Sequence, residues 1–263
     1  MKRNAIARII VLSLILLVLT GILVAALVGR LYFTEYHSGT AATGEVKIDP
    51  SRVSGLEISW AAGTVTIKTA DTPMILISEE GNSNSRPMVY NIDEGKLEIY
   101  HSFGSVGFTA PEKDLTVIVP IGWKCRELDI DAAGVEVNID GLWAESVDLD
   151  GAGLDLSYDG KFTSLKCDGA GCTLDIIGQD WPELVEINGA GCDVELTFPH
   201  GCGFVADLDG LGCAFASNAE SSRRDGKYVY GNEFCEINAD GLGIAVNVLY
   251  GPFDPLPTEK VQG

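Results

Sequence analysis

The sequence predicts an all-β fold: a single-stranded β-helix, or β-solenoid, with coils of about 20 residues, preceded by one N-terminal transmembrane helix. Three observations carry this prediction. Residues 9–29 contain no charged side chain. From Val46 onward, apolar and polar residues alternate, which is typical of half-buried strands. Finally, one pattern of strand, Gly-rich turn and strand recurs along the chain.

The apolar run of residues 9–29 predicts a membrane anchor, because it is long enough to cross a hydrocarbon core of about 30 Å. Lys2, Arg3 and Arg8 precede it, so the positive-inside rule places residues 1–8 in the cytoplasm. The alternative is a cleaved signal peptide, whose apolar region is typically only about 7–15 residues long. The predicted location is therefore the cell membrane, spanned once, with an extracytoplasmic C-terminal domain.

Three segments follow the predicted anchor. Residues 30–45 form the predicted linker, in which residues 34–45 are small and polar. Residues 46–250 form the predicted β-solenoid domain. Residues 251–263 hold three prolines and predict a loose C-terminal tail.

The repeat is the strongest fold signal. Five segments align without gaps, a sixth has a weaker first strand, and a seventh fits with one extra residue; they begin at Leu128, Val147, Leu165, Val185, Ile237, Ala206 and Leu56. The last glycine of each of six turns is Gly134, Gly153, Gly171, Gly191, Gly212 and Gly243. If each unit makes one coil, equivalent strands stack in parallel about 4.8 Å apart.

Stacking in sequence order would align alternate apolar residues into two inward columns. One column is Ile130, Leu149, Cys167, Ile187, Leu208 and Ala239, and the other is Val135, Leu154, Cys172, Cys192, Cys213 and Ile244. The cysteines in these columns have Val, Leu and Ile as neighbours, so we interpret them as small buried apolar residues. Disulfides between adjacent coils are the alternative outside the cytoplasm, and Cys125, Cys202 and Cys235 are left open.

Charge limits the possible partners. The first 33 residues hold four basic and no acidic residues, so the rest carries 14 basic against 38 acidic residues, a net charge of −24. Such a surface repels nucleic acid and anionic lipid, and it suits a cationic partner or metal ions. We expect no nucleic acid partner.

An acidic column precedes the glycine turns: Asp131, Asp150, Asp168, Asn188, Asp209 and Asp240. Asx side chains favour turns because they accept backbone N–H groups locally. Stacked carboxylates could instead bind Ca²⁺, which prefers oxygen ligands. The turn interpretation is preferred, and a calcium-stabilised repeat domain remains the weaker alternative.

Two further features have a structural and a functional interpretation. Each predicted coil has a second corner, which follows the second strand of the unit. An aromatic residue recurs there every 19 residues, at Trp143, Phe162 and Trp181. These residues predict a stacked hydrophobic seam or, alternatively, a sugar-binding column. Residues 217–233 interrupt the repeat and carry Arg223, Arg224, Lys227, Tyr228 and Tyr230. A solvated hairpin around Asp225-Gly226 is preferred there over a recognition loop.

Signals for catalysis are absent from the sequence. The only histidines are His37, His101 and His200, and none has metal-ligand spacing. There is no GxSxG elbow and no phosphate-binding GxxxxGK[ST] loop. A carboxylate pair of the glycoside hydrolase type is the remaining alternative. We therefore expect no enzyme, and we assign no catalytic, cofactor-binding or metal-binding residue.

The units LEISWAAGTVTI from Leu56 and LDIDAAGVEVNI from Leu128, with LTVIVP before Gly122, resemble the bacterial β-strand-repeat domains labelled putative adhesins. The likeness covers roughly residues 46–250, although the GAG-Cys turns depart from the more polar turns of that family. The resemblance implies a right-handed β-helix outside a bacterial membrane, and it carries over no ligand residues.

The function predicted first is a non-enzymatic adhesion or envelope-scaffold module that binds a cell-envelope polymer or a surface protein. The alternative is a regulatory extracytoplasmic domain of a membrane signalling or envelope-stress system, because eight cytoplasmic residues are too few to signal alone. The sequence does not specify the oligomeric state.

Overall fold

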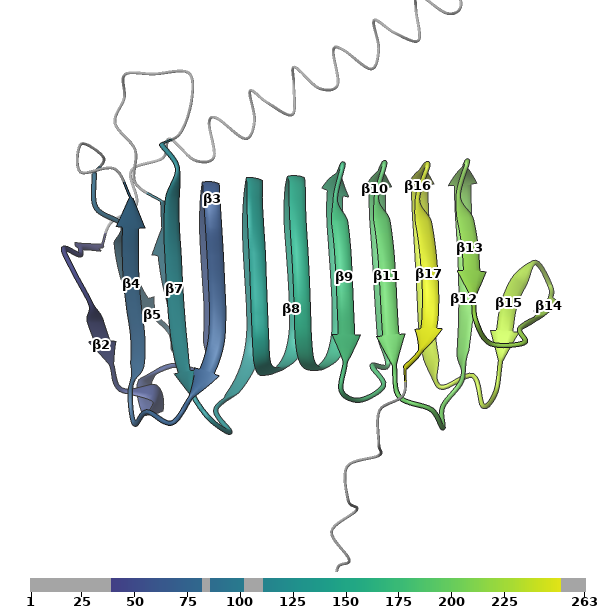
Figure 1. The fold of residues 1–263 in the computed structure, drawn as a ribbon, viewed down its shortest axis with the longest axis horizontal. Coiled ribbons are helices and arrows are strands. Elements are labelled where there is room, and N and C mark those ends of the chain that lie inside the picture. Colours follow the sequence, from purple (N-terminus) through teal and green to yellow (C-terminus); the bar gives the residue numbers. More distant parts are fainter. Residues whose placement is uncertain (1–38, 82–85, 102–110, 252–263) are drawn as a thin grey trace, which may run out of the picture. The chain divides into compact units, whose positions relative to one another are not determined.

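The computed structural model describes residues 39–81, 86–101 and 111–251, and in these ranges the chain is built of strands (Figure 1). The predicted all-β class is thereby confirmed. One short 3-10 turn, η1 (Pro50–Arg52), is capped by Asp49, whose carboxylate accepts the N–H of Ser51. No helix among the described residues is long and apolar enough to cross a membrane. The predicted anchor at 9–29 and the tail after 251 lie outside the described residues.

The strands follow the alternating segments of the sequence. The strands that precede the repeat unit beginning at Leu128 are β1 (Thr40–Ala41), β2 (Val46–Ile48), β3 (Gly55–Ala70), β4 (Ile75–Gly81), β5 (Val89–Asp93), β6 (Lys96–Tyr100) and β7 (Lys113–Pro120). The others are β8 (Lys124–Ala170), β9 (Thr173–Gly178), β10 (Leu184–Ala190), β11 (Asp193–Phe198), β12 (Phe204–Leu211), β13 (Ala214–Ser217), β14 (Ser222–Arg224), β15 (Lys227–Tyr230), β16 (Cys235–Leu242) and β17 (Ala245–Tyr250).

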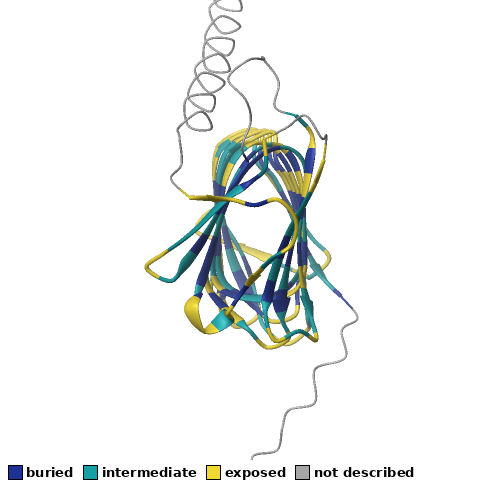
Figure 2. Cartoon of the chain, turned by 90° about the vertical axis from the view of Figure 1, so that its left-hand side faces the viewer, coloured by how far each residue is buried: buried dark blue, intermediate teal, exposed yellow. Residues whose placement is uncertain are grey.

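Equivalent strands of different units pair in parallel and in register. Glu186 of β10 faces Lys166 of β8 on one side and Asn238 of β16 on the other. Likewise Val194 of β11 lies between Leu174 of β9 and Val246 of β17. The two sets of strands form two walls that face each other (Figure 2).

We call these sets the first wall and the second wall. The first wall contains the strands that precede the glycine turns: β6, β10, β12, β16 and the corresponding stretches of β3 and β8. The second wall contains the strands that follow those turns: β7, β9, β11, β13, β17 and the remaining stretches of β3 and β8.

The predicted inward columns lie between the walls and are buried, with two exceptions. Leu208 and Cys213 are only half-buried, because Leu208 lies in β12 and Cys213 directly precedes β13, the two strands at the end of the row of units. The contribution of the column residues is hydrophobic, since each removes its apolar side chain from water.

The order of the units in space differs from their order in the sequence, which corrects the predicted columns. β16 lies between β10 and β12, and β17 lies between β11 and β13, so Ala239 separates Ile187 from Leu208. The same happens near the beginning, where β3 lies between β8 and the β6 and β7 strands. The physical reason is that the units share one alternation and one glycine turn, so the pattern of a unit does not specify which units become its neighbours.

Antiparallel strands extend the walls at their ends. At the N-terminal end, β5 and β1 extend the first wall from β6, and β4 and β2 extend the second wall from β7. At the C-terminal end, β15 and β14 extend the first wall from β12.

Candidate functional site

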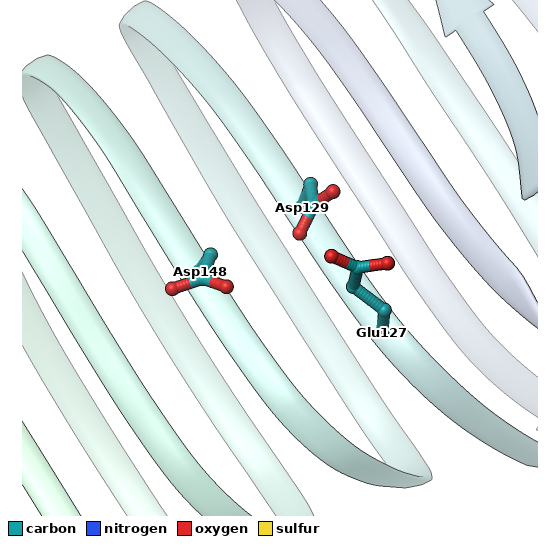
Figure 3. A group of neighbouring side chains, drawn as sticks. All are labelled: Glu127, Asp129 and Asp148. Atoms are coloured by element: carbon teal, nitrogen blue, oxygen red, sulfur yellow. The ribbon is translucent and has the colours of Figure 1, made fainter.

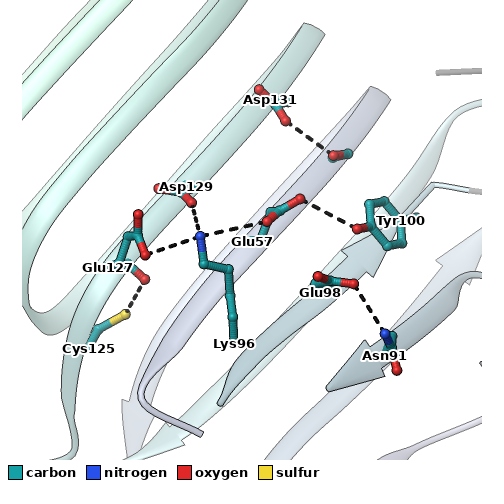
Figure 4. A network of polar contacts seen from close by, with 10 residues as sticks. Glu57, Asn91, Lys96, Glu98, Tyr100, Cys125, Glu127, Asp129 and Asp131 are labelled. Atoms are coloured by element: carbon teal, nitrogen blue, oxygen red, sulfur yellow. Dashed lines mark hydrogen bonds and ion pairs between the residues drawn. The ribbon is translucent and has the colours of Figure 1, made fainter. Parts of the chain in front are cut away.

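A network of charged side chains lies on the outer face of the first wall, centred on Lys96 (Figure 4). Gly55 of β3 pairs with Lys96 on one side and Glu127 on the other. Because Gly55 has no side chain, Lys96 crosses it and reaches the carboxylates beyond. Its Nζ lies 2.6 Å from an oxygen of Asp129, 3.1 Å from one of Glu127 and 3.8 Å from one of Glu57.

The pKa values of Lys96 and Glu57 are both raised, for different reasons. Burial alone would lower the pKa of Lys96, but its hydrogen bonds to Asp129 and Glu127 outweigh burial and raise that pKa. Burial raises the pKa of Glu57, and Lys96 opposes that shift. Lys96 therefore stays a cation and supplies positive charge to a wall of carboxylates.

Three carboxylates of this wall form a tight group: Glu127, Asp129 and Asp148 (Figure 3). Each offers an oxygen, and these oxygens lie within 4.8 Å of one another. One oxygen of Asp129, Oδ1, is buried without a hydrogen-bond partner. Oxygen ligands suit a hard cation such as Ca²⁺, but Lys96 already lies against two of these carboxylates.

The acidic column predicted beside the glycine turns has polar partners of its own. The amide of Asn188 donates to Asp168 Oδ1 at 2.9 Å, and the Ser59 hydroxyl donates to Asp131 Oδ2 at 3.3 Å. Asp209 Oδ1 accepts the N–H of the next residue, Gly210, at 2.8 Å. Of these three contacts, only that of Asp209 lies within one turn, as the turn interpretation predicts; the contacts of Asp168 and Asp131 join different units. The group of Glu127, Asp129 and Asp148 lies two or four residues before the predicted column along the strands.

Two shallow hollows adjoin at Arg126 and Glu127, which line both. The first has a volume of about 330 Å³ and extends towards Lys96 and Glu57. The second has a volume of about 530 Å³ and is lined by Trp143 together with serine and threonine hydroxyls. The combination of an indole, an arginine, carboxylates and hydroxyls on an open surface can bind a polar ligand, and we take it as the candidate site.

Trp143 reaches this hollow because the predicted aromatic column is shifted by one residue. Phe162 and Trp181 are buried, as the seam interpretation requires, but at the preceding corner Leu142 and Ala144 are buried and Trp143 is only half-buried. Gly160 lies against Leu142 of the preceding unit, since a Cβ at Gly160 would be 2.2 Å from the Leu142 carbonyl oxygen. The two corners therefore align with an offset of 18 residues and not 19, which places Phe162 beside Ala144. The Lys124 ammonium lies 3.7 Å from the Trp143 ring centroid.

The insertion at 217–233 forms a hairpin that covers the C-terminal end of the core. Tyr228 stacks on Phe215 at 4.6 Å, and Arg223 lies over the Tyr228 ring at 4.8 Å. Arg224 pairs with Glu233, and Lys227 pairs with Asp207 at 2.8 Å. The preferred interpretation, a hairpin around Asp225-Gly226, agrees with the pairing of β14 with β15, although the hairpin also packs on the core.

The core cysteines behave as small apolar residues. Cys167, Cys172 and Cys192 are buried, and Cys125 and Cys235 are buried as well. The pKa of Cys192 is raised, first by its contact with the Cys172 thiol and then by burial. A thiol with a raised pKa is a poor nucleophile.

Sequence reasoning missed Lys96, Arg126 and the exposure of Trp143 as members of one site. The unit that begins at Leu56 carries a signal for the first of these, because a glycine at position 55 leaves room for a long side chain on the neighbouring strand. No sequence signal showed that Lys96 belongs to that neighbour.

No family model matches the chain, and no curated protein matches it. Among solved structures, a "putative cell adhesion protein" from Clostridium sporogenes is 14% identical, with a TM-score of 0.51 over 81% of this chain and 100% of that chain. A "putative adhesin" from Bacteroides fragilis is 10% identical, with a TM-score of 0.43 over 80% and 98%. A "putative lipid binding protein" from Parabacteroides distasonis is 15% identical, with a TM-score of 0.32 over 81% and 95%. The first likeness shows a shared fold, and its description agrees with the family that the sequence resembles.

Proposed function

We propose that the protein is a membrane-anchored, extracytoplasmic β-solenoid that acts as a non-enzymatic adhesion or envelope-scaffold module. We further propose that it binds a cell-envelope polysaccharide at the second of the two hollows, which Trp143 lines. In-register parallel pairing of β8, β10 and β16 supports the solenoid, since equivalent strands stack one unit apart. The uncharged run at 9–29 supports the anchor.

The observation that carries the ligand class is the half-buried Trp143 beside polar side chains. An indole offers a flat apolar face to the C–H groups of a sugar ring, and its polar edge tolerates water. Arg126, Glu127 and Glu145, with the nearby hydroxyls, supply hydrogen-bond donors and acceptors for ring hydroxyls. The hollow is shallow and open, which suits a polymer that passes along the surface.

Binding of the full-length protein in lipid nanodiscs to isolated envelope polysaccharide tests this proposal. Trp143→Ala should weaken binding about fivefold, because loss of one aromatic contact costs about 1 kcal/mol. Trp143→Phe keeps a flat ring and should retain most of the affinity. Asp175→Asn, on the exposed face of the second wall, is the control and should leave binding unchanged.

The outcomes separate the alternatives. Equal binding by wild type and Trp143→Ala would reject the hollow as the site. If no polysaccharide binds and in-cell cross-linking captures one membrane protein, the regulatory alternative replaces adhesion.

A further inference from the structure

The second wall ends in an open edge at the C-terminal end of the row. β13 pairs with β17 through Ala214↔Ala245 to Ser217↔Val248, and within residues 39–81, 86–101 and 111–251 no strand pairs with its other side. The other three wall ends are extended by antiparallel strands. Figure 1 shows β13 as the last strand of its wall.

The backbone of β13 has hydrogen-bonding groups available on that side. Ala214 and Asn218 donate their N–H groups to Ile244 and Val248 of the neighbouring segment. In a parallel ladder, alternate residues direct their N–H and C=O groups to opposite sides. Phe215 and Ser217 therefore direct theirs away from β17, where an added strand would find them.

The composition of β13 does not protect this edge. Natural edge strands are usually blunted by charged residues, prolines or bulges. The sequence of β13 is AFAS, in which Ala214 and Ala216 are exposed and no residue is charged. An uncharged exposed edge of this kind favours strand addition.

Exposed apolar side chains lie beside the edge. Leu211, at the end of β12, is 77% exposed, and its register partner Leu242 is 57% exposed. Both lie in the last two units of the row. Burying them would add hydrophobic stabilisation to any strand pairing at β13.

The charge of this end is closer to neutral than that of the domain as a whole. Residues 204–233 hold three basic side chains and five acidic ones, a net charge of −2. Two of the basic side chains are paired with acidic ones, Arg224 with Glu233 and Lys227 with Asp207. The region after residue 33 has a net charge of −24, so repulsion between two copies is reduced at this end but not removed.

We propose that β13 pairs antiparallel with β13 of a second copy, so that the protein forms an end-to-end dimer about a two-fold axis. A second copy offers a free strand of matching length, whereas the other outermost strands described here, β1, β2 and β14, have two or three residues. Two-fold symmetry makes the pairing of identical edges antiparallel and self-complementary. The interface is small, so the dimer belongs to the weak, concentration-dependent class.

Sedimentation velocity of the full-length protein in a nonionic detergent, over a range of concentrations, tests the proposal. The wild type should shift from monomer to dimer as the concentration rises. Ala216→Lys places two like charges next to the axis and should raise the apparent dissociation constant at least tenfold. The control is Thr173→Lys, which adds the same charge to β9, an exposed position on a strand that is paired on both sides; it should dimerise like the wild type.

Amide hydrogen exchange of the wild type gives a second readout that needs no variant. The amides of Phe215 and Ser217 should gain protection as concentration rises, while those of β9 should not change. A wild type that stays monomeric throughout would overturn the proposal. Dimerisation unaffected by Ala216→Lys, or weakened equally by Thr173→Lys, would also overturn it, because association would then involve another surface or the segment 9–29.

Discussion

At the scale of single residues, His101 shows how burial fixes a protonation state. The His101 ring stacks on Trp60 with centroids 4.6 Å apart, and Nδ1 accepts the N–H of Ala61 at 3.1 Å. Burial, and next the positive charge of Lys113, lower the pKa of His101 to about 3. The folded protein therefore holds a neutral imidazole at neutral and mildly acidic pH.

This shift predicts a loss of stability on acidification. Below the unfolded pKa of about 6.5, the unfolded chain binds a proton that the folded chain does not, so the free energy of unfolding falls as the pH decreases towards 3. Between pH 7 and pH 5 the loss from this residue is about 2 kcal/mol. Urea denaturation at the two pH values measures it. His101→Asn keeps a side-chain acceptor for Ala61 and should remove most of that difference.

The control for this prediction is His200→Asn, since His200 is exposed. This variant should keep the full pH dependence of the wild type. If His101→Asn lost stability on acidification as steeply as the wild type does, titration of His101 would not be the cause.

At the scale of the repeated element, two glycines of one turn have different roles. Gly189 has φ 143°, and a Cβ there would lie 1.8 Å from the carbonyl oxygen of Gly169 in the neighbouring unit. Gly191 has φ 67°, and a Cβ there would meet nothing within 4 Å. Close approach of two backbones thus requires glycine at 189, whereas only the left-handed conformation favours it at 191.

Alanine substitutions separate these two requirements. Gly191→Ala should lower the free energy of unfolding by about 1–2 kcal/mol, the cost of a left-handed conformation for a residue with a Cβ. Gly189→Ala must also move a paired strand, so we expect a loss of more than about 3 kcal/mol. Chemical denaturation of the two variants compares them directly. Equal losses would mean that the units can shift apart at no cost.

The same element shows how far the sequence alone could predict the site. Alternation of apolar and polar residues correctly identified buried positions such as Ile130 and Leu154. The prediction failed at Trp143, because the corners at Trp143 and Phe162 are offset by 18 residues, whereas the aromatic residues recur every 19. A shift of one residue reverses which side chain of the corner points inward. Corner lengths depend on backbone packing between units, and the alternation within each strand does not record them.

At the scale of the whole described region, the spatial order of the units was not predictable from the sequence. Every unit has the same alternation and the same glycine turn, so each pattern fits beside any other. In the chain, β4 and β5 lie between β3 and β6, and β14 and β15 lie between β13 and β16. In both places antiparallel strands extend a wall before the next unit of the row is formed. The pattern of a repeat therefore predicts the class of fold better than it predicts which units are neighbours.

The order of the units predicts an inverted pattern of amide exchange near the C-terminal end. β17 pairs on both sides, with β11 and β13, whereas β13 is the outer strand and pairs only with β17 among the described strands. Strands that are paired and buried on both sides open less often than end strands. In dilute full-length protein, where β13 is unpaired at its edge, Val246 should therefore exchange more slowly than Phe215, although it lies 31 residues closer to the C-terminus. Hydrogen exchange with mass spectrometry measures both peptides, and the β9 peptide provides the reference for a strand inside the row. Faster exchange at Val246 than at Phe215 would mean that the units stack in sequence order and that the last one lies at the end.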